Sequence, residues 1–420
     1  MREYKESSDQ CIQWMGKIPS HWDSCGLKRT VNLINEKTTD DSLVYIGLEN
    51  IESFTGRLSE AEFVTAESTC NSFEIGDILF NKLRPYLTKT IIADFKGKCT
   101  TELLVLRNFR GNPKYLNYIL LSPDYIGYID SSTYGSKMPR ANWSFIGNVS
   151  IPIPPHSEQQ HIVSFLDEKT AKIDEYIDKK NKEIEALKEW KKALIAHVVT
   201  KGLNTKAKMK DSGVSWIGEI PEHWKVKRLG SAFIENRTLN SSLEITEAYK
   251  FNYGALIRKD EDVNPTEMTD TYCKYTCLNV NDIILNGLNL NYDFVSQRVA
   301  KAYARGIITS AYLTLTPRDG INSNYYLYLL KSMDSMKLFH GMGTGIRLTL
   351  SFNEIKKQQI LFPPIEEQQE IVEYIDAATT KADKMIVELT NHVESMKEYK
   401  QRLIADVVTG KINVQPEKVI

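Results

Sequence analysis

Polar and basic side chains gather in two pairs of loops, at matching places in two halves of the chain. These stretches are residues 81–86 and 134–140 in the first half, and 286–292 and 341–347 in the second. Arginine and lysine can bind guanine edges or phosphates, and asparagine can pair bidentately with adenine. A protein that reads the major groove needs these residue types, although merely solvated loops have a similar composition. The candidate DNA-contacting residues are Lys82, Arg84, Tyr86, Lys137, Arg140, Asn286, Asn289, Asn291, Arg298, Thr344 and Arg347.

Catalytic interpretations of the sequence are weaker. A base methyltransferase would carry an Asn/Asp-Pro-Pro-Tyr/Phe type motif, and the double prolines are instead preceded by Ile153 and Phe362. The glycines at 341, 343 and 345 resemble a cofactor loop but do not open a βαβ unit, and no GxxxxGK[ST] phosphate loop occurs. The acids and lysine at 124, 167 and 169 match a magnesium nuclease site poorly. We therefore predict a protein that is not an enzyme and binds no cofactor or metal itself.

The loops belong to a duplicated chain. The residues of Trp14-x-Gly-x-Ile-Pro-x-His-Trp22 recur as Trp216-x-Gly-x-Ile-Pro-x-His-Trp224. Residues 155–200 align without a gap on residues 364–409, with 21 identities in 46 positions. Between these blocks the similarity fades, although Arg140 and Phe145 align with Arg347 and Phe352. Two similar modules that recognise two different things would have this pattern.

Each constant block predicts a long helix. Residues 157–199 contain no glycine or proline, and their apolar positions follow heptad-like spacings, from Leu166 and Ile173 to Val198. Ser157 and Gln160 predict a capping box at the start of the first helix. We expect the two copies to bury their apolar stripes against each other as an antiparallel pair, a rod of fixed length with a variable body at either end. The alternative is that each helix packs on its own body.

The variable bodies are predicted to be small α+β domains related by an internal pseudo-twofold duplication. The expected boundaries are 1–153 for the first recognition domain, 154–203 for the first spacer helix, 204–362 for the second recognition domain, and 363–420 for the second spacer helix with its tail. The expected strands are 43–47, 78–80, 90–95 and 103–107, and the expected helices are 113–121, 125–131 and approximately 324–339.

Composition sets the broad class. The 420 residues are 42% hydrophobic and 25% charged, and the formal net charge is −1, which argues weakly against a nucleic-acid binder. No apolar run is long enough to span a membrane and the N-terminus lacks a secretory pattern, so we expect a cytoplasmic protein without membrane contact. The six cysteines have neither CxxC pairs nor zinc-site spacing, and reduced thiols are expected.

The doubled motifs closely resemble those of the specificity subunit of type I DNA restriction-modification systems. The resemblance covers nearly the whole chain and rests on the Trp-Gly-Ile-Pro-His-Trp segments and on Pro-Pro-x-x-Glu-Gln-Gln at 154–160 and 363–369. The helix endings Leu194-Ile-Ala-His-Val-Val-Thr200 and Leu403-Ile-Ala-Asp-Val-Val-Thr409 complete it. None of these motifs carries chemistry. For Trp14, Trp22 and their copies we expect packing against the helix pair, and for Trp190 an interface or core role.

The resemblance implies two target-recognition domains that read the two halves of a split, asymmetric site in double-stranded DNA. It also implies two modification subunits, which bind S-adenosylmethionine and methylate adenine, and restriction subunits that use ATP and Mg²⁺ and join outside. The main alternative is a duplicated coiled-coil scaffold whose bodies bind other proteins and not DNA. The salt dependence of DNA binding distinguishes the two.

Overall fold

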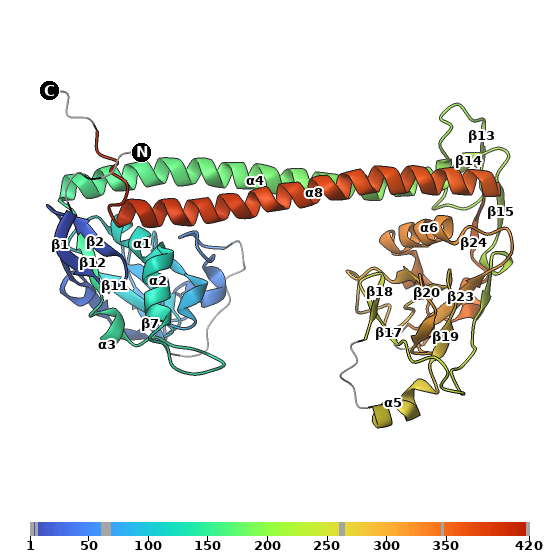
Figure 1. Cartoon of the computed structure of the whole chain (residues 1–420), viewed down its shortest axis with the longest axis horizontal. Helices are drawn as coiled ribbons and strands as arrows, with labels where there is room; N and C mark the ends of the chain where they lie inside the picture. Colours follow the sequence, from blue (N-terminus) through green and yellow to red (C-terminus); the bar gives the residue numbers. More distant parts are fainter. Residues whose placement is uncertain (1–3, 5–6, 60–68, 260–264, 346–347, 417–420) are drawn as a thin grey trace. The chain divides into compact units, whose positions relative to one another are not determined.

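The protein folds into two compact units, each of which takes half of two long helices. The computed structural model describes residues 4, 7–59, 69–259, 265–345 and 348–416. The first unit comprises Met1–Lys182 and Leu389–Ile420, and the second comprises Glu183–Glu388. Helix α4 (His156–Lys201, green in Figure 1) begins in the first unit and ends in the second, and α8 (Ile365–Val408, red) does the reverse.

The first unit contains two four-stranded sheets that share one core. Phe73, Leu79, Cys99 and Val105 belong to a single apolar cluster to which both sheets contribute. One sheet has the order β4 (Asn32–Ile34), β11 (Leu103–Arg107), β8 (Ile78–Asn81), β9 (Thr90–Ile92), and the other has β5 (Lys37–Thr38), β7 (Cys70–Phe73), β10 (Gly97–Cys99), β6 (Tyr45–Ile46). The first sheet is antiparallel throughout, whereas β10 and β6 are parallel.

Short strand pairs and helices complete this unit. Helix α1 (Pro113–Leu121) follows Asn112, whose side chain accepts a hydrogen bond from Lys114 N, and its first residue is Pro113, which the first turn of a helix tolerates. Pro123 likewise starts α2 (Pro123–Asp130), two residues before the predicted position. The remaining elements are the pairs β1 (Ser7–Ile12) with β2 (Gly16–Pro19) and β3 (Asp23–Gly26) with β12 (Ser150–Ile153), and the helices α1 (Pro113–Leu121), α2 (Pro123–Asp130) and α3 (Trp143–Ile146).

The second unit repeats the antiparallel sheet of the first. Its order is β16 (Phe233–Glu235), β23 (Leu313–Pro317), β20 (Ile283–Leu285), β21 (Val299–Lys301), which matches β4, β11, β8, β9. Four two-stranded pairs accompany it: β13 (Met209–Asp211) with β14 (Glu219–Pro221), β15 (Lys225–Arg228) with β24 (Gln359–Phe362), β17 (Tyr249–Asn252) with β18 (Ala255–Arg258), and β19 (Thr276–Leu278) with β22 (Gly306–Ile308). The predicted duplicated α+β fold is thus confirmed.

One longer helix takes the place of α1 and α2 in the second unit. Helix α6 (Ser323–Ser335) lies between the long helices and the sheet strands of this unit (Figure 1). It ends earlier than the predicted residue 339 because Lys337 has a positive φ of 60°, and a 3₁₀ turn, Leu338–Gly341, follows. The other helices are α5 (Pro265–Tyr272) and α7 (Phe352–Ile355).

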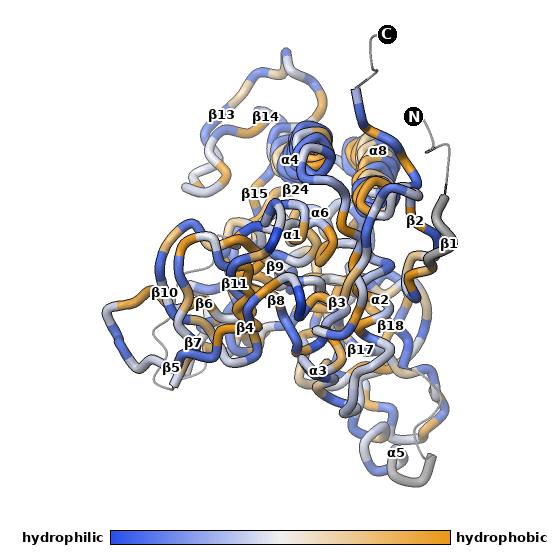
Figure 2. The backbone as a smooth tube through the Cα atoms, turned by 90° about the vertical axis from the view of Figure 1, so that its left-hand side faces the viewer, coloured by the Kyte–Doolittle hydropathy of each residue, from blue (hydrophilic) through white to orange (hydrophobic). Residues whose placement is uncertain are grey.

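Within each unit the halves of α4 and α8 pair antiparallel. Asp174 binds Lys400 at 2.7 Å in the first unit. Lys191 binds Asp383 in the second, and these two residues are the copies of Lys400 and Asp174 in the duplication. Leu166, Ile173 and the rest of the predicted stripe lie on the buried or half-buried face. In Figure 2 both helices carry hydrophobic positions (orange) among hydrophilic ones (blue).

The start of α4 differs from the prediction. The helix begins at His156, and Glu158 N and Gln159 N both donate to the carbonyl of Pro155, so Ser157 lies inside the first turn and is not the cap. The predicted capping box is therefore wrong. The proline carbonyl replaces it, and α8 begins in the same way, with Gln368 N donating to Pro364 O.

The described part of the chain contains no helix long and apolar enough to cross a membrane. The six cysteines all lie in the described part of the chain and form no disulfide there, and Cys70 and Cys99 are buried.

Candidate nucleic-acid interface

Backbone hydrogen bonds bring the two candidate loops of the first unit together. Ala141 N donates to Lys82 O at 2.9 Å, and Arg84 N donates to Pro139 O at 2.7 Å. Leu83 and Arg140 form an isolated β-bridge. The stretches 82–86 and 134–140, separated by about 50 positions in the sequence, therefore form one continuous surface.

The side chain of Asn81 shapes the first of these loops. Its amide donates to Leu83 O at 3.0 Å and Arg84 O at 3.1 Å, and its oxygen accepts from Lys89 N at 2.9 Å. Asn81 is fully buried, so all three bonds are formed away from solvent. Arg84 takes the left-handed conformation with φ of 51°, and Asn289 in the second unit has φ of 52°. A residue with positive φ thus occurs at the matching place of both loops, arginine in one copy and asparagine in the other.

The candidate cations of the first unit differ in what neutralises them. Arg140 binds Glu102 through Nε and Nη2, each at 3.1 Å from Oε1, and this hydrogen-bonded pairing raises the pKa of Arg140. Arg84 Nη2 donates to Lys137 O at 3.1 Å, which orients its guanidinium without neutralising its charge. Within the described residues, Lys82, Arg84 and Lys137 have no carboxylate partner. Tyr86, beside them, is 46% exposed.

The two candidate loops of the second unit meet in the same way. Leu350 N donates to Gly287 O at 2.9 Å, and Leu290 N donates to Leu348 O at 3.2 Å. Gly287 is required here, since a Cβ atom would lie 2.8 Å from Leu350 O. Gly341 ends the 3₁₀ turn Leu338–Gly341, and Gly343 and Gly345 flank Thr344, which forms a bridge with Thr349. This arrangement does not have the strand-turn-helix form of a cofactor loop.

The polar candidates of the second unit are unequally accessible. Asn289 is exposed, whereas Asn286 and Asn291 are half-buried, and the Asn286 side-chain oxygen accepts from Leu288 N at 3.2 Å. Thr344 is exposed, and its hydroxyl donates to Glu354 Oε1 at 2.9 Å. Arg347 lies outside the described residues. Asn289 is therefore the best-presented asparagine of the three.

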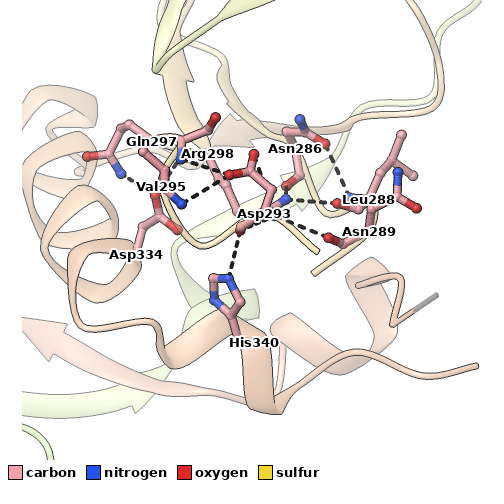
Figure 3. A network of polar contacts seen from close by, with 10 residues as sticks. Asn286, Leu288, Asn289, Asp293, Val295, Gln297, Arg298, Asp334 and His340 are labelled. Carbon is pink, nitrogen blue, oxygen red and sulfur yellow. Dashed lines mark hydrogen bonds and ion pairs between the residues drawn. The ribbon is translucent and has the colours of Figure 1, made fainter. Parts of the chain in front are cut away.

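Arg298 lies inside the loop and not on its surface (Figure 3). It is 1% exposed, and its Nη1 donates to Asn286 O at 3.2 Å and Leu288 O at 2.8 Å. Its Nη2 donates to Asp293 O at 2.8 Å and to Asn289 O at 3.4 Å. With its donors directed at these carbonyls, the guanidinium organises the loop instead of facing DNA.

The structure also corrects the alignment of the two copies beyond these loops. Asn142 precedes α3 and Ser351 precedes α7, so Trp143 is the equivalent of Phe352. The bridge of Tyr134 with Arg140 matches that of Thr344 with Thr349. The alignment of Arg140 with Arg347 and of Phe145 with Phe352 was therefore wrong by two residues. A single identical residue is not enough to align two loops whose lengths differ.

The Pro-Pro-x-x-Glu-Gln-Gln motifs attach the long helices to the domains that carry the loops. Gln159, 2% exposed, donates to Pro154 O at 2.9 Å and accepts from Asn112 N at 2.8 Å, at the start of α1. Gln368 makes the same two bonds, to Pro363 O at 2.9 Å and from Asn322 N at 3.0 Å, at the start of α6. Sequence reasoning noted the motif but missed this role, for which the available signal was a glutamine at the same distance after a double proline in both copies.

Tyrosines and the Trp-Gly-Ile-Pro-His-Trp segments hold the helix ends. Tyr325 donates to Val199 O at 2.8 Å, and its counterpart Tyr115 donates to Val408 O at 3.3 Å. His21 pairs with Glu158 at 2.9 Å, and His223 pairs with Glu367 at 2.5 Å. The two copies use the same contacts.

Trp22 and Trp224 pack against the ends of the long helices, as predicted. Trp224 is fully buried against Gly202 at the end of α4, and Trp22 lies against Gly410 at the end of α8. Trp14 is buried as well, whereas Trp190 is 46% exposed and therefore not a core residue.

The acids considered for a metal site have other partners. Asp167 accepts from Tyr118 at 2.7 Å and pairs with Lys114 at 2.6 Å, and Asp124 lies 3.5 Å from Lys411. Among the residues that the structure describes, no group of three or more His, Cys, Asp or Glu side chains is placed to hold a metal ion.

Comparisons with known proteins agree with this arrangement. The family described as "Type I restriction modification DNA specificity domain" matches residues 32–186 and 221–395, together more than half of the chain. The "Putative type I restriction enzyme MjaX specificity subunit" of Methanocaldococcus jannaschii is 24% identical over 98% of both chains. The EcoKI specificity subunit of Escherichia coli K12 is 22% identical over 93% of this chain and 82% of its own.

Solved structures share the fold. A chain from a structure titled "Structural basis underlying complex assembly and conformational transition of the type I R-M system" aligns with a TM-score of 0.69, at 17% identity over 94% of this chain and 100% of its own. The HsdS subunit from Thermoanaerobacter tengcongensis aligns with a TM-score of 0.50, at 18% identity over 94% of this chain and 98% of its own.

Proposed function

We infer that this protein recognises DNA sequence for a type I restriction-modification system, because the chain belongs to the family of type I restriction modification DNA specificity domains. Members of this family recognise DNA and catalyse no reaction. The chain carries two copies of the domain, one in each half. The protein is accordingly a non-catalytic specificity subunit with two DNA-recognition domains.

Each domain reads one half of a split, asymmetric site through its paired loops. We propose residues 1–153 and 204–362 as the recognition domains, and 154–203 and 363–420 as the spacer helices with their tail. The observation that carries the proposal is the repeated joining of two loops in each unit, by Ala141 with Lys82 in one and Leu350 with Gly287 in the other. The same frame presents different side chains in each copy, as two different half-sites require.

The reading residues divide by chemistry. Lys82, Arg84 and Lys137 would contact phosphates or guanine edges, with Tyr86 beside them, and Asn289 would contact adenine. Arg140 shares its charge with Glu102, and Arg298 acts by positioning the loop. Asn286, Asn291, Thr344 and Arg347 complete the proposed set.

The chain acts with partner subunits. We propose two modification subunits, which bind S-adenosylmethionine and methylate adenine, and restriction subunits that use ATP and Mg²⁺. A base must leave the duplex stack to be methylated, and the modification subunits would perform that step while this chain sets the register on the flanking duplex. Because its substrate would be chromosomal and invading DNA, we propose that it works in the cytoplasm.

We expect the full chain together with a modification subunit to retard random-sequence duplex DNA in a gel shift, with affinity that falls as salt rises. Phosphate contacts release counterions, and three neutralised phosphates would give a slope of about −3 in log affinity against log salt. The same gel shift with the full chain alone is the comparison. Binding that is absent, or that never depends on salt, would instead favour a scaffold that binds other proteins. A methylation assay with radiolabelled cofactor should detect no transfer by the chain without its partner.

Replacing Arg84 with alanine should weaken binding to the cognate site by about 1–3 kcal/mol and relax discrimination in one half-site only. The reason is its position on the joined loops, where Lys137 O orients the guanidinium. Affinity for duplexes altered at single positions would measure the effect. Lys96→Ala, a 57% exposed lysine of the same unit outside both loops, is the control. An equal loss on every duplex would make Arg84 a phosphate contact.

A further inference from the structure

The second unit carries an exposed apolar segment on its candidate reading loop. Tyr292, Phe294 and Val295, here called the apolar tip, are 73%, 54% and 90% exposed. Residues 286–297 contain no lysine or arginine, and the arginine that follows is buried. The matched loop of the first unit instead presents Lys82 and Arg84. These two matched loops therefore differ in charge and in hydrophobicity.

Side chains of the loop itself and of the residue that follows it form hydrogen bonds with the backbone of the loop that carries this tip. Besides the four carbonyls bound by Arg298, Asp293 Oδ1 accepts from Val295 N at 3.1 Å and Ser296 N at 2.9 Å. These backbone hydrogen bonds, that of Ser296 first, lower the pKa of Asp293. The carboxylate is thus committed to the loop, and the backbone on both sides of Phe294 is fixed.

Two further residues anchor the loop to α6 and the turn after it. Asp334 Oδ2 accepts from Arg298 N at 2.7 Å, and the side chain of Gln297 donates to the same oxygen. His340 Nε2 lies 3.1 Å from Asp293 O (Figure 3). The ring of His340 stacks on Phe294, with ring centroids 4.6 Å apart. The apolar tip is therefore ordered before any partner binds, which reduces the entropy lost on binding.

The position and chemistry of the tip identify what it would contact. It continues the loop of Asn289, the best-presented candidate for adenine, and its lack of cations leaves little affinity for phosphates. On the major-groove edge of an A·T pair, adenine offers the donor and acceptor that asparagine matches, and thymine offers a methyl group that apolar side chains contact. One loop thus holds the groups that suit both bases of that pair.

We propose that the second recognition domain reads A·T pairs through the apolar tip, with Val295 and Phe294 against thymine methyl groups, while the first domain reads its half-site through cations. This inference rests on the proposed DNA-recognition function and adds which base pairs the second domain reads. If it holds, binding to one half-site depends on thymine methyl groups.

The test uses the assembled complex of the full chain with its modification subunits. Mapping the methylated adenines of a genome that expresses the system gives both half-sites. Duplexes with that site are then made with deoxyuridine in place of thymine, one half-site at a time. We expect about fourfold weaker binding for each contacted methyl group that is removed, in one half-site only.

The substitution V295S tests whether the apolar tip causes the loss of affinity on deoxyuridine duplexes. V295S should weaken binding to the thymine duplex by a similar factor and reduce the further loss on deoxyuridine by that factor, because the methyl group contacted by Val295 no longer has its partner while that contacted by Phe294 keeps its own. Val295 is 90% exposed, so the variant should fold. Val280→Ser is the matched control, since Val280 is 54% exposed and lies before β20, at the opposite end of the strand from the loop. It should keep the full sensitivity to deoxyuridine.

The outcomes separate this inference from the proposed function. Specific binding that is unaffected by deoxyuridine in either half-site, or a V295S variant as sensitive as the parent protein, overturns the inference alone. So does a mapped site in which neither half contains an A·T pair besides the methylated one. Complexes that bind no DNA at all overturn the proposed function and the inference with it.

Discussion

Replacing Trp224 with alanine is expected to lower the free energy of unfolding of the second unit by about 3–5 kcal/mol. Trp224 is fully buried, with its ring 3.2 Å from the position of a Cβ atom at Gly202, so the indole fills the space against the end of α4. Its Nε1 also donates to Glu367 at 2.8 Å. Alanine would leave a cavity and remove this bond at once.

Hydrogen exchange read by mass spectrometry would localise the loss. Amides of β14, β15 and the end of α4 should exchange faster, while those of the sheet of the first unit keep their protection, since opening is local where units are separate. Trp190→Ala is the control, because that tryptophan is 46% exposed and its loss should change stability by less than about 0.5 kcal/mol. Similar losses for the two variants would contradict the structural role given to Trp224.

The long helices and several elements of the domains were predictable because the sequence patterns that indicate them are periodic or occur twice. The apolar spacing from Leu166 to Val198 predicts a helix with one buried face, and this prediction does not depend on which partner buries that face. The same holds for the strand at residues 103–107 and the helix at 113–121, where an apolar run and an Asn-Pro start are local features. The occurrence of candidate loops at matching places in the two copies was visible in the sequence, whereas their contact within each unit was not predicted.

The details of the reading loops were not predictable from local pattern. Arg298 beside asparagines looks like a DNA contact in the sequence, but in the folded loop its guanidinium binds backbone carbonyls. Gln159 bonds to Asn112, 47 residues earlier, which no spacing rule reveals. Both residues act through tertiary contacts, and burial of a polar side chain depends on partners that the sequence does not place next to it.

The other large effect on stability is expected at an ion pair between the long helices. Because the chain is duplicated, this ion pair occurs twice and the two copies can be compared. The ion pair of Asp174 with Lys400 and its copy, Asp383 with Lys191, have the same residue types in the same register but different burial. The side chains of Asp174 and Lys400 are 16% and 8% exposed, and Arg57 also binds Asp174 at 2.9 Å. Those of Asp383 and Lys191 are 58% and 22% exposed. Environment is thus the main difference between the two pairs.

We expect Asp174→Ala to lower the free energy of unfolding of the first unit by about 3 kcal/mol, because Lys400 would be left as a buried charge without its partner. Asp383→Ala should cost the second unit less than about 1 kcal/mol, since water replaces much of what an exposed carboxylate provides. Urea titrations followed by hydrogen exchange in each unit would measure both values. Adding Lys400→Met to Asp174→Ala should restore part of the loss by removing the stranded cation. Equal costs at the two positions, or no recovery in the double variant, would show that burial does not control the strength of this pair.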